Sequence, residues 1–214
     1  VTTMVLNGKI NTRILAACRD LHLPAIGISG VDAGLIRAHK RPPVEVEGHA
    51  GGPVDFGYVG DIDSVDTDVV RAQLDNGMVP IVSPLSADDS GTVLNINADT
   101  VAAALATALG ASKLILTMGA PGILEDRHNP SSLVSYLDLE DLQELRTNGS
   151  LAEGMLPKAR AIEAAIKGGV PRVHLISYKI PDSLLLEIFT NEGTGTLVVA
   201  DTDTLTPEEQ EAGA

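Results

Sequence analysis

The sequence predicts an α/β fold in which helices cover a mostly parallel sheet. Short apolar stretches alternate along the chain with longer helical stretches, which is typical of this class. Only 2% of the 214 residues are aromatic whereas 44% are hydrophobic, so leucine, isoleucine, valine and alanine must form the core. Such cores are typical of parallel sheets that are buried on both faces. The length suits one sizeable α/β domain or two small lobes.

In the first half of the chain, glycine, proline and polar residues separate the predicted elements. A helix extends from the start of the chain to Leu21, and Gly30 ends a short apolar strand over Pro24 to Ser29. Residues 37–53 are rich in proline, glycine and charge, which predicts a hairpin or an excursion from the sheet. The elements expected next are a strand over 55–65, a helix over 66–76, a buried strand over 78–83, a turn over 86–91 and a strand over 93–95.

The second half continues the alternation of helices and strands. We expect helices over 98–110, 139–147 and 157–167, strands over 113–118, 172–176 and 196–199, and a loop over 119–132. Gly110 ends the first of these helices and Gly168 follows the last one, as is common at helix ends. The acidic, polar residues 201–214 predict a loose tail.

Composition excludes several classes of partner. The formal net charge of -14 argues against nucleic acid and against anionic membrane surfaces. The single cysteine, Cys18, cannot form an internal disulfide and suits a reducing cytosol, so we expect a cytoplasmic protein. The histidines show no metal-ligand spacing, and no protein-held metal site is predicted.

Two predicted helices begin with polar or charged residues. Asn97-Ala98-Asp99 opens one helix, and Pro157-Lys158 opens another. Because helix N-termini favour anions, a lysine in the first turn contributes little to helix stability. A lysine at this position therefore indicates an anionic ligand beside the helix N-terminus. Purely structural alternatives are an N-cap for Asn97, a first-turn acid for Asp99 and a surface lysine for Lys158.

Several stretches, in the same order, resemble the acetylglutamate kinases of the amino acid kinase family. They read LNGKIN, AIGISGVDAGLI, VDFGYVGDI, NINAD, GMLPK, VHLI and LLLEIFTNEGTGT, at residues 6–11, 25–36, 54–62, 95–99, 154–158, 173–176 and 184–196. The resemblance covers nearly the whole chain. Members of the family carry a further upstream segment with a lysine and a glycine-rich phosphate loop. We therefore expect this chain to be a fragment that binds ATP weakly, is prone to aggregate and does not turn over alone.

The resemblance implies a three-layer αβα sandwich of the amino acid kinase, or carbamate kinase-like, fold that lacks its first strands. Residues 1–110 would form an acylamino-acid-binding lobe, 111–200 a nucleotide-binding lobe and 201–214 an acidic tail. The implied activity is the phosphorylation of the side-chain carboxylate of N-acetyl-L-glutamate in arginine biosynthesis, with ATP and Mg²⁺, by a homo-oligomer that acts on small molecules. Alternatives are a kinase for N-acetyl-aminoadipate or N-succinylglutamate, and a non-catalytic arginine-sensing domain.

The resemblance also assigns residues. Lys158 would stabilise the transition state, Asp99 would hold lysines in place, and Asn95 and Asn97 would bind the acylamino acid. The nucleotide-binding residues would be Met118, Gly119, Ala120, Pro121, Gly122, Ile123, Gly154 and Met155. Gly119 stands where an aspartate is common in the family, and a glycine still lets the backbone approach a phosphate closely. Residues 116–124 taken alone also fit a plain strand-to-helix turn.

His174, Glu187 and Gly193 keep the order and spacing of the arginine site in feedback-inhibited members of the family. The alternative is structural. In that case His174 caps a strand and Glu187 is a solvated helix residue.

Overall fold

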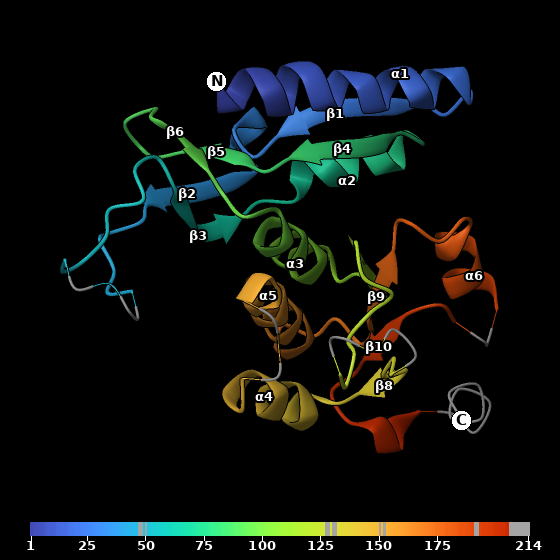
Figure 1. The fold of residues 1–214 in the computed structure, drawn as a ribbon. Helices are drawn as coiled ribbons and strands as arrows, with labels where there is room; N and C mark the ends of the chain where they lie inside the picture. The colour runs from blue at the N-terminus through green and yellow to red at the C-terminus, as the bar shows by residue number, and fades with distance from the viewer. Residues whose placement is uncertain are drawn as a thin grey trace. The chain divides into compact units, whose positions relative to one another are not determined.

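The computed structural model describes residues 1–46, 49, 51–126, 129, 132–149, 151, 153–190 and 193–205. The chain divides into two compact units, Val1–Val101 (unit 1) and Ala102–Ala214 (unit 2). Both units combine helices with sheets that contain parallel strand pairs, so the predicted α/β class is confirmed (Figure 1). Helix α3 (Ala98–Leu109) begins in unit 1 and continues into unit 2.

Unit 1 contains two sheets. Strands β1 (Ala25–Ser29) and β4 (Val79–Ser83) pair in parallel. The second sheet has the order β3-β2-β5-β6, formed by Gly60–Val65, Ile36–Lys40, Leu85–Ala87 and Val93–Asn95. Strands β2 and β5 are parallel, whereas β3 and β6 run antiparallel to their neighbours. Strands β2 and β3 are neighbours, but β3 begins at Gly60, beyond the segment 37–53 that was expected to be a hairpin or an excursion. Val44 in that segment forms an antiparallel bridge with Val54.

The predicted opening helix is confirmed, but its first part is a π-helix (η1, Met4–Asn11) that continues into α1 (Thr12–Asp20). Asn11 is buried, and its Nδ2 donates to the carbonyl of Ile81 at 2.9 Å and to Ser83 Oγ at 3.0 Å. A Cβ on Gly27 would lie 2.1 Å from Asn11 Oδ1, so only glycine lets the helix approach β1 this closely. These contacts fix the helix to both strands of the first sheet.

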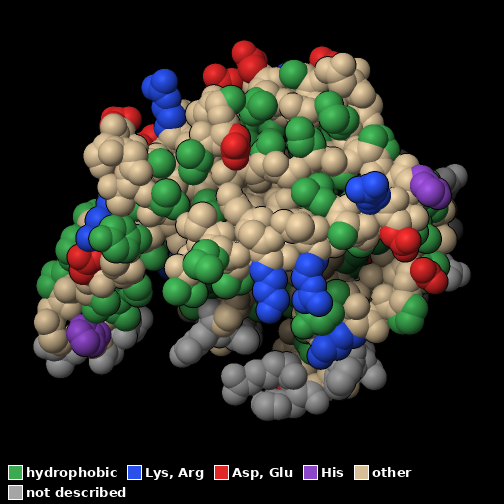
Figure 2. Space-filling model, turned by 90° about the horizontal axis from the view of Figure 1, so that it is seen from above, with side chains coloured by type: hydrophobic (Ala, Val, Ile, Leu, Met, Phe, Trp, Pro, Cys, Tyr) green, Lys and Arg blue, Asp and Glu red, His purple; other side chains and the backbone are tan. Residues whose placement is uncertain are grey.

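Helices η1 and α1 also carry apolar side chains to the surface. Figure 2 views the molecule from the side of this helix, where green apolar side chains are visible. The exposed large apolar residues of the two helices are Met4, Val5, Ile10 and Ile14. Helix α2 (Asp68–Asp75) packs against β4.

Unit 2 is built on one sheet with the order β7-β9-β10-β8. Its strands are Leu114–Met118, Val173–Ser177, Thr196–Val198 and Tyr136–Leu137, in that order. Strand β9 is parallel to β7 and antiparallel to β10, and β10 is parallel to β8. The helices are α4 (Leu139–Thr147), α5 (Leu156–Lys167) and α6 (Ser183–Phe189), with 3₁₀ turns at Glu153–Met155 and Thr202–Thr204.

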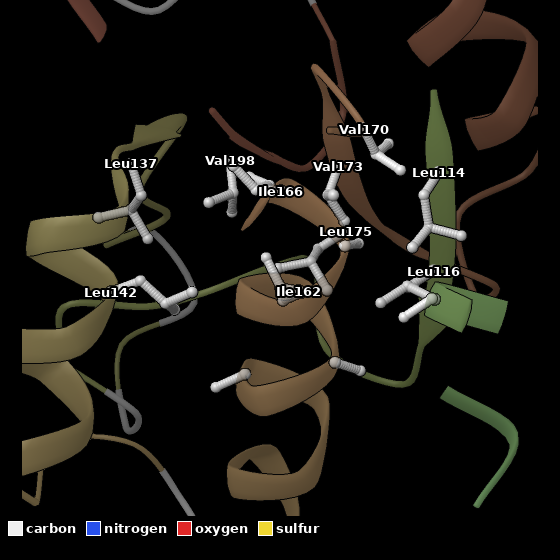
Figure 3. Close-up of a cluster of buried hydrophobic side chains, with 14 of the residues drawn as sticks. Leu114, Leu116, Leu137, Leu142, Ile162, Ile166, Val170, Val173, Leu175 and Val198 are labelled. Atoms are coloured by element: carbon white, nitrogen blue, oxygen red, sulfur yellow. The ribbon is translucent and has the colours of Figure 1, made fainter. Parts of the chain in front are cut away.

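This sheet and helices α4 and α5 form most of the core of unit 2 (Figure 3), to which Ala103 and Ala106 of α3 also contribute. Every residue of β9 is buried, and Ile162 and Ile166 of α5 contribute to the same cluster of aliphatic side chains as Leu142 of α4. Asp138 caps α4 by accepting the backbone N–H of Asp141 at 2.8 Å. The predicted aliphatic core is therefore present.

The structure differs from the sequence-based elements in four places. The strand expected over 55–65 begins only at Gly60, and β5 lies partly inside the segment expected to be a turn. Strand β8 and helix α6 were not expected as elements. Helix α6 buries Ser183 and Glu187 and exposes its apolar residues, namely Leu184, Leu185, Leu186, Ile188 and Phe189. Hydrophobic periodicity therefore gives no signal for it.

Of the stretch expected to be an acidic tail, only residues 201–205 are described. Asp201 accepts the backbone N–H of Asp203 at 2.9 Å, and Leu205 packs with Leu197 and Val199. Residues 206–214 lie outside the described residues.

Candidate functional site

The predicted substrate residues of unit 1 lie at the junction of β6 and α3. Asn97 Oδ1 accepts the backbone N–H groups of Asp99 at 3.0 Å and of Thr100 at 3.2 Å. This is the geometry of an N-cap, so the structural role considered for Asn97 is present. Asp99 lies in the first turn of α3, where a carboxylate interacts favourably with the helix dipole.

Asn95 ends β6 and projects away from the core. Its neighbours Leu94 and Ile96 are buried, so strand alternation turns Asn95 to the opposite face, where it is exposed. The Asn95 backbone N–H donates to the carbonyl of Tyr58 at 2.8 Å. Asn95 and Tyr58 also line a cavity of about 180 Å³ within unit 1, together with Val1, Thr2, Thr3, Leu85 and Val93. The structure thus brings Asn95, Asn97 and Asp99 together and places Asn95 at the wall of a cavity.

Lys158 is in the first turn of α5, in unit 2, and only 9% of it is exposed. The surface-lysine alternative is therefore wrong. Met155 occupies the N-cap position of α5 without a side-chain cap hydrogen bond, and a proline follows at the start of the helix. The first backbone N–H groups of a helix have no partner within the helix. This end of α5 thus presents amide groups and a buried cation near each other, and both favour an anion.

The predicted nucleotide loop follows β7 in the same unit. The backbone N–H of Ile123 donates to Thr196 Oγ1 at 2.9 Å, and Thr196 Oγ1 donates to the carbonyl of Val134 at 2.7 Å. A Cβ on Gly122 would lie 2.5 Å from Thr196 Oγ1, which explains the glycine. The loop is fixed to β10 and leads to a bridge between Leu124 and Leu133. It is therefore not a plain strand-to-helix turn.

The two remaining residues that were assigned to nucleotide binding, Gly154 and Met155, lie in the segment that leads into α5. Gly154 and Met155 belong to the 3₁₀ turn that immediately precedes the helix. Met155 also packs against the core of unit 2. The turn therefore connects the core to the end of α5 that carries Lys158.

His174, Glu187 and Gly193 form one cluster, in which Gly193 is exposed. His174 Nδ1 lies 2.7 Å from Glu187 Oε1, and the backbone N–H of Thr194 donates to Glu187 Oε2 at 2.7 Å. Gly193 has a φ of 45° and lies against the same carboxylate. Both side chains are buried, at 5% and 8% exposure, so the alternative of a solvated Glu187 is wrong. His174 Nε2 is buried without a hydrogen-bond partner among the described residues.

The electrostatics of this cluster favour an ionised Glu187. Burial alone would raise the pKa of the carboxyl group. Hydrogen bonds from His174 and from the backbone N–H groups of Thr194 and Gly195 stabilise the carboxylate and outweigh burial. The pKa of Glu187 therefore lies below its usual value.

Two further observations concern metals and membranes. Within the described ranges, no three His, Cys, Asp or Glu side chains are grouped so that they could hold a metal ion. None of the helices in that part of the chain is long and apolar enough to cross a membrane.

Sequence reasoning missed Thr196, which fixes the nucleotide loop, and Tyr58, which lines the cavity of unit 1. A lone threonine in an apolar strand gives no local signal for such a contact. Its role depends on the pairing of β10 with β9 and β8.

Comparison with known proteins places these features in a family. Residues 1–177 match the model of the amino acid kinase family. Acetylglutamate kinase from Myxococcus xanthus is 51% identical over 201 residues, which cover 92% of this chain and 65% of that protein. The enzyme of the same name from Heliobacterium modesticaldum is 44% identical, and the match covers 93% of this chain and 68% of that protein. The chain thus spans about two thirds of the length of these curated relatives.

Solved structures agree on the fold. N-acetylglutamate synthase from Neisseria gonorrhoeae, complexed with coenzyme A and N-acetyl-glutamate, has a TM-score of 0.76 at 28% identity, over 91% of this chain and 42% of that one. An isopentenyl phosphate kinase gives a TM-score of 0.63 at 20% identity, over 89% of this chain and 66% of that one, which shows a shared fold alone.

Proposed function

Because this chain belongs to the amino acid kinase family, we propose that it carries much of an ATP-dependent kinase that phosphorylates the side-chain carboxylate of N-acetyl-L-glutamate. The observation that carries the proposal is the first turn of α5. It combines a buried lysine, Lys158, with a helix N-terminus that has no side-chain cap. The relatives named acetylglutamate kinase, at 40–51% identity, support the choice of substrate.

The reaction is the transfer of a phosphoryl group between two anions. A carboxylate oxygen of the substrate forms a bond to the γ-phosphorus, the bond to the β,γ-bridging oxygen breaks, and ADP leaves. The nucleophile is already ionised, so no general base is needed. Catalysis depends on positioning and on neutralising the charge of the transferring group. Lys158 and the amide groups at the start of α5 would supply part of that charge in unit 2.

The β6–α3 junction would hold the acceptor. Asn95 lines the cavity of unit 1 and carries an amide that can donate to a carboxylate or an acyl oxygen. Asn97 and Asp99 begin the adjacent helix, where Asp99 would orient the catalytic lysines. The assignment of this cavity to the acylamino acid and of residues 118–123 to the nucleotide follows from the family resemblance of those stretches.

Mg²⁺ is proposed as the companion of ATP. In kinases the ion is usually held by one or two carboxylates together with phosphate oxygens of the nucleotide. Its contribution would be to neutralise charge on the phosphates. A homo-oligomer and a cytoplasmic location also remain part of the proposal.

A second role concerns the cluster of His174, Glu187 and Gly193. The gonococcal synthase was also solved in complex with L-arginine, and it shares 28% identity with 84% of this chain. We therefore propose that arginine binds beside this cluster. Its guanidinium group would approach the Glu187 carboxylate, which is held ionised.

The kinase proposal is tested with the 214-residue chain and with a chimera in which the N-terminal segment of the Myxococcus xanthus enzyme precedes Val1. Each protein is given MgATP with N-acetylglutamate, N-acetyl-aminoadipate or N-succinylglutamate, and the acyl phosphate is trapped with hydroxylamine. We expect hydroxamate only from the chimera, with N-acetylglutamate as the best acceptor. A folded, ATP-binding chimera that yields no hydroxamate from any acceptor would exclude the kinase, and preference for another acceptor would correct the substrate.

A further inference from the structure

The carboxyl ends of two parallel strands bring a second segment next to the nucleotide loop. Strands β7 and β9 are parallel neighbours in register, with Met118 opposite Ser177. The backbone N–H of Tyr178 donates to the carbonyl of Met118 at 3.1 Å. The residues that follow β9 therefore lie beside Gly119 and not elsewhere on the unit. In open α/β sheets, this edge is where ligands bind.

Two side chains of this segment lie against Gly119. A Cβ on Gly119 would be 3.0 Å from Tyr178 Oη and 3.8 Å from Lys179 Cε. Any side chain at position 119 would thus occupy the space next to the tyrosine hydroxyl. Because Gly119 has no side chain, this space stays open between the loop backbone, the phenol of Tyr178 and the end of the Lys179 side chain.

The segment that carries these side chains is held firmly. The backbone N–H of Lys179 donates to Ser177 Oγ at 3.2 Å, and Ser177 is buried. Ser183 Oγ donates to the carbonyl of Ser177 at 2.8 Å, which ties the start of α6 to the end of β9. Hydrogen bonds that are buried or partly buried therefore fix the backbone of Tyr178 and Lys179.

Both side chains are nevertheless open to a ligand. Tyr178 is 68% exposed, and Lys179 is also exposed. No carboxylate in the described part of the chain forms an ion pair with Lys179. The surface therefore offers a phenol hydroxyl, an ammonium group and a glycine backbone together. These groups suit a phosphate. The phenol hydroxyl and the ammonium group can both donate hydrogen bonds to phosphate oxygens, and the ammonium group also adds a positive charge.

We propose that Tyr178 and Lys179 bind the phosphates of the nucleotide on the side of the loop where Gly119 lies. The Lys179 ammonium pairs with a phosphate oxygen, and the Tyr178 hydroxyl donates a hydrogen bond to the same group. This inference rests on the proposed function, because it adds two residues to the proposed nucleotide site.

The test measures nucleotide affinity on the 214-residue chain by isothermal titration calorimetry, with ATP and with adenosine as ligands. Lys179→Met should weaken ATP binding about 10-fold or more, as expected for the loss of a charge-assisted hydrogen bond. Lys179→Arg should restore most of that loss. Tyr178→Phe, which removes only the hydroxyl, should weaken ATP binding about 3-fold to 10-fold. Adenosine carries no phosphate, so its affinity should not change.

Lys113→Met is the matched control. Lys113 is exposed and precedes β7, at the end of the strand opposite Gly119. Its loss changes the net charge equally but leaves the loop intact, so ATP affinity should stay within about 2-fold. Circular dichroism checks that all variants keep the parent fold.

The outcomes separate this inference from the proposed function. Unchanged ATP affinity in Lys179→Met, or an equal loss in Lys113→Met, would overturn the assignment of Lys179 and leave the kinase proposal standing. A chimera that binds no ATP would overturn both. A Lys179-dependent ATP site in a chimera without acylamino-acid phosphorylation would overturn the kinase proposal alone.

Discussion

The side-chain oxygen of Asn97 accepts the backbone N–H of Asp99 at 3.0 Å, so two residues proposed for one site also begin helix α3 together. A change at Asn97 will therefore alter helix stability whether or not a ligand is bound. The choice of variant therefore has to separate effects on the free energy of unfolding from effects on substrate binding.

Asn97→Ala should lower the free energy of unfolding by about 1 kcal/mol, because two backbone N–H groups lose their acceptor. Asn97→Ser keeps a capping oxygen and should retain most of the stability. Urea unfolding measures both. If Asn97 also contacts the acylamino acid, Asn97→Ser will raise the KM of the chimera although its stability is retained. Equal destabilisation by both variants would contradict the capping role.

Asn95→Ala should raise the KM of the chimera for N-acetylglutamate about 10-fold, as expected for a lost hydrogen bond to a charged group of about 1.5–3 kcal/mol. Asn95 is exposed at the cavity wall, so the substitution should leave stability nearly unchanged. Asn76→Ala, at the end of α2 outside this cavity, is the control for loss of an exposed asparagine. Equal KM values for the parent and Asn95→Ala would remove Asn95 from the substrate site.

Lys158→Met should lower kcat of the chimera about 100-fold or more, with a smaller effect on the KM for ATP. The lysine charge is needed most where negative charge gathers in the transition state. Lys167→Met removes a lysine from the other end of α5, where it pairs with Glu163 at 2.6 Å. That control should cost about 0.5 kcal/mol of stability and leave kcat unchanged. A kcat near that of the parent in Lys158→Met would exclude Lys158 from the mechanism.

Glu187 should make the stability of the chain depend on pH. Its pKa is lowered by folding, so the carboxylate contributes stability that is complete above the unfolded-state pKa of about 4.3. That contribution is lost as the pH falls through the lower pKa of the folded state. Glu187→Gln should therefore cost about 1.5–3 kcal/mol at pH 7, because the substitution weakens hydrogen bonds to a buried charged group. At lower pH the difference between variant and parent should become smaller.

Urea unfolding at a series of pH values measures this effect, with Glu144→Gln, an exposed acid on α4, as the control. A difference between Glu187→Gln and the parent that is the same at every pH would show that the carboxylate charge does not contribute. The same pair of proteins, titrated with arginine, tests the arginine proposal, since Glu187→Gln should lose that binding.

Local signals made some elements predictable. Helix α4 was predicted with its observed bounds, because Asp138 provides an N-cap and Leu139, Leu142 and Leu145 recur at helical spacing. Strand β5 was missed because it has only three residues and precedes a polar turn. It pairs with β6 across that turn and with the distant strand β2 at one position. Helix α6 was missed because its polar residues face inward.

The same division applies to the candidate site. Residues in sequence motifs, such as Asn95 and Lys158, could be selected from the sequence. The burial of Lys158 could not, since a lysine has no local feature that predicts it. The approach of Tyr178 to Gly119 depends on the parallel register of β7 and β9, which joins residues 59 positions apart through the pair Met118 and Ser177.

The contact between Asn11 and Gly27 has a consequence for how this sequence can vary. An alanine at position 27 would place its methyl group 2.1 Å from the Asn11 side chain, whose amide also binds Ile81 and Ser83. Neither position can change freely while the other is kept. In natural descendants of this gene the two residues are therefore expected to be inherited as a pair, and a side chain could appear at position 27 only after a smaller residue had replaced Asn11.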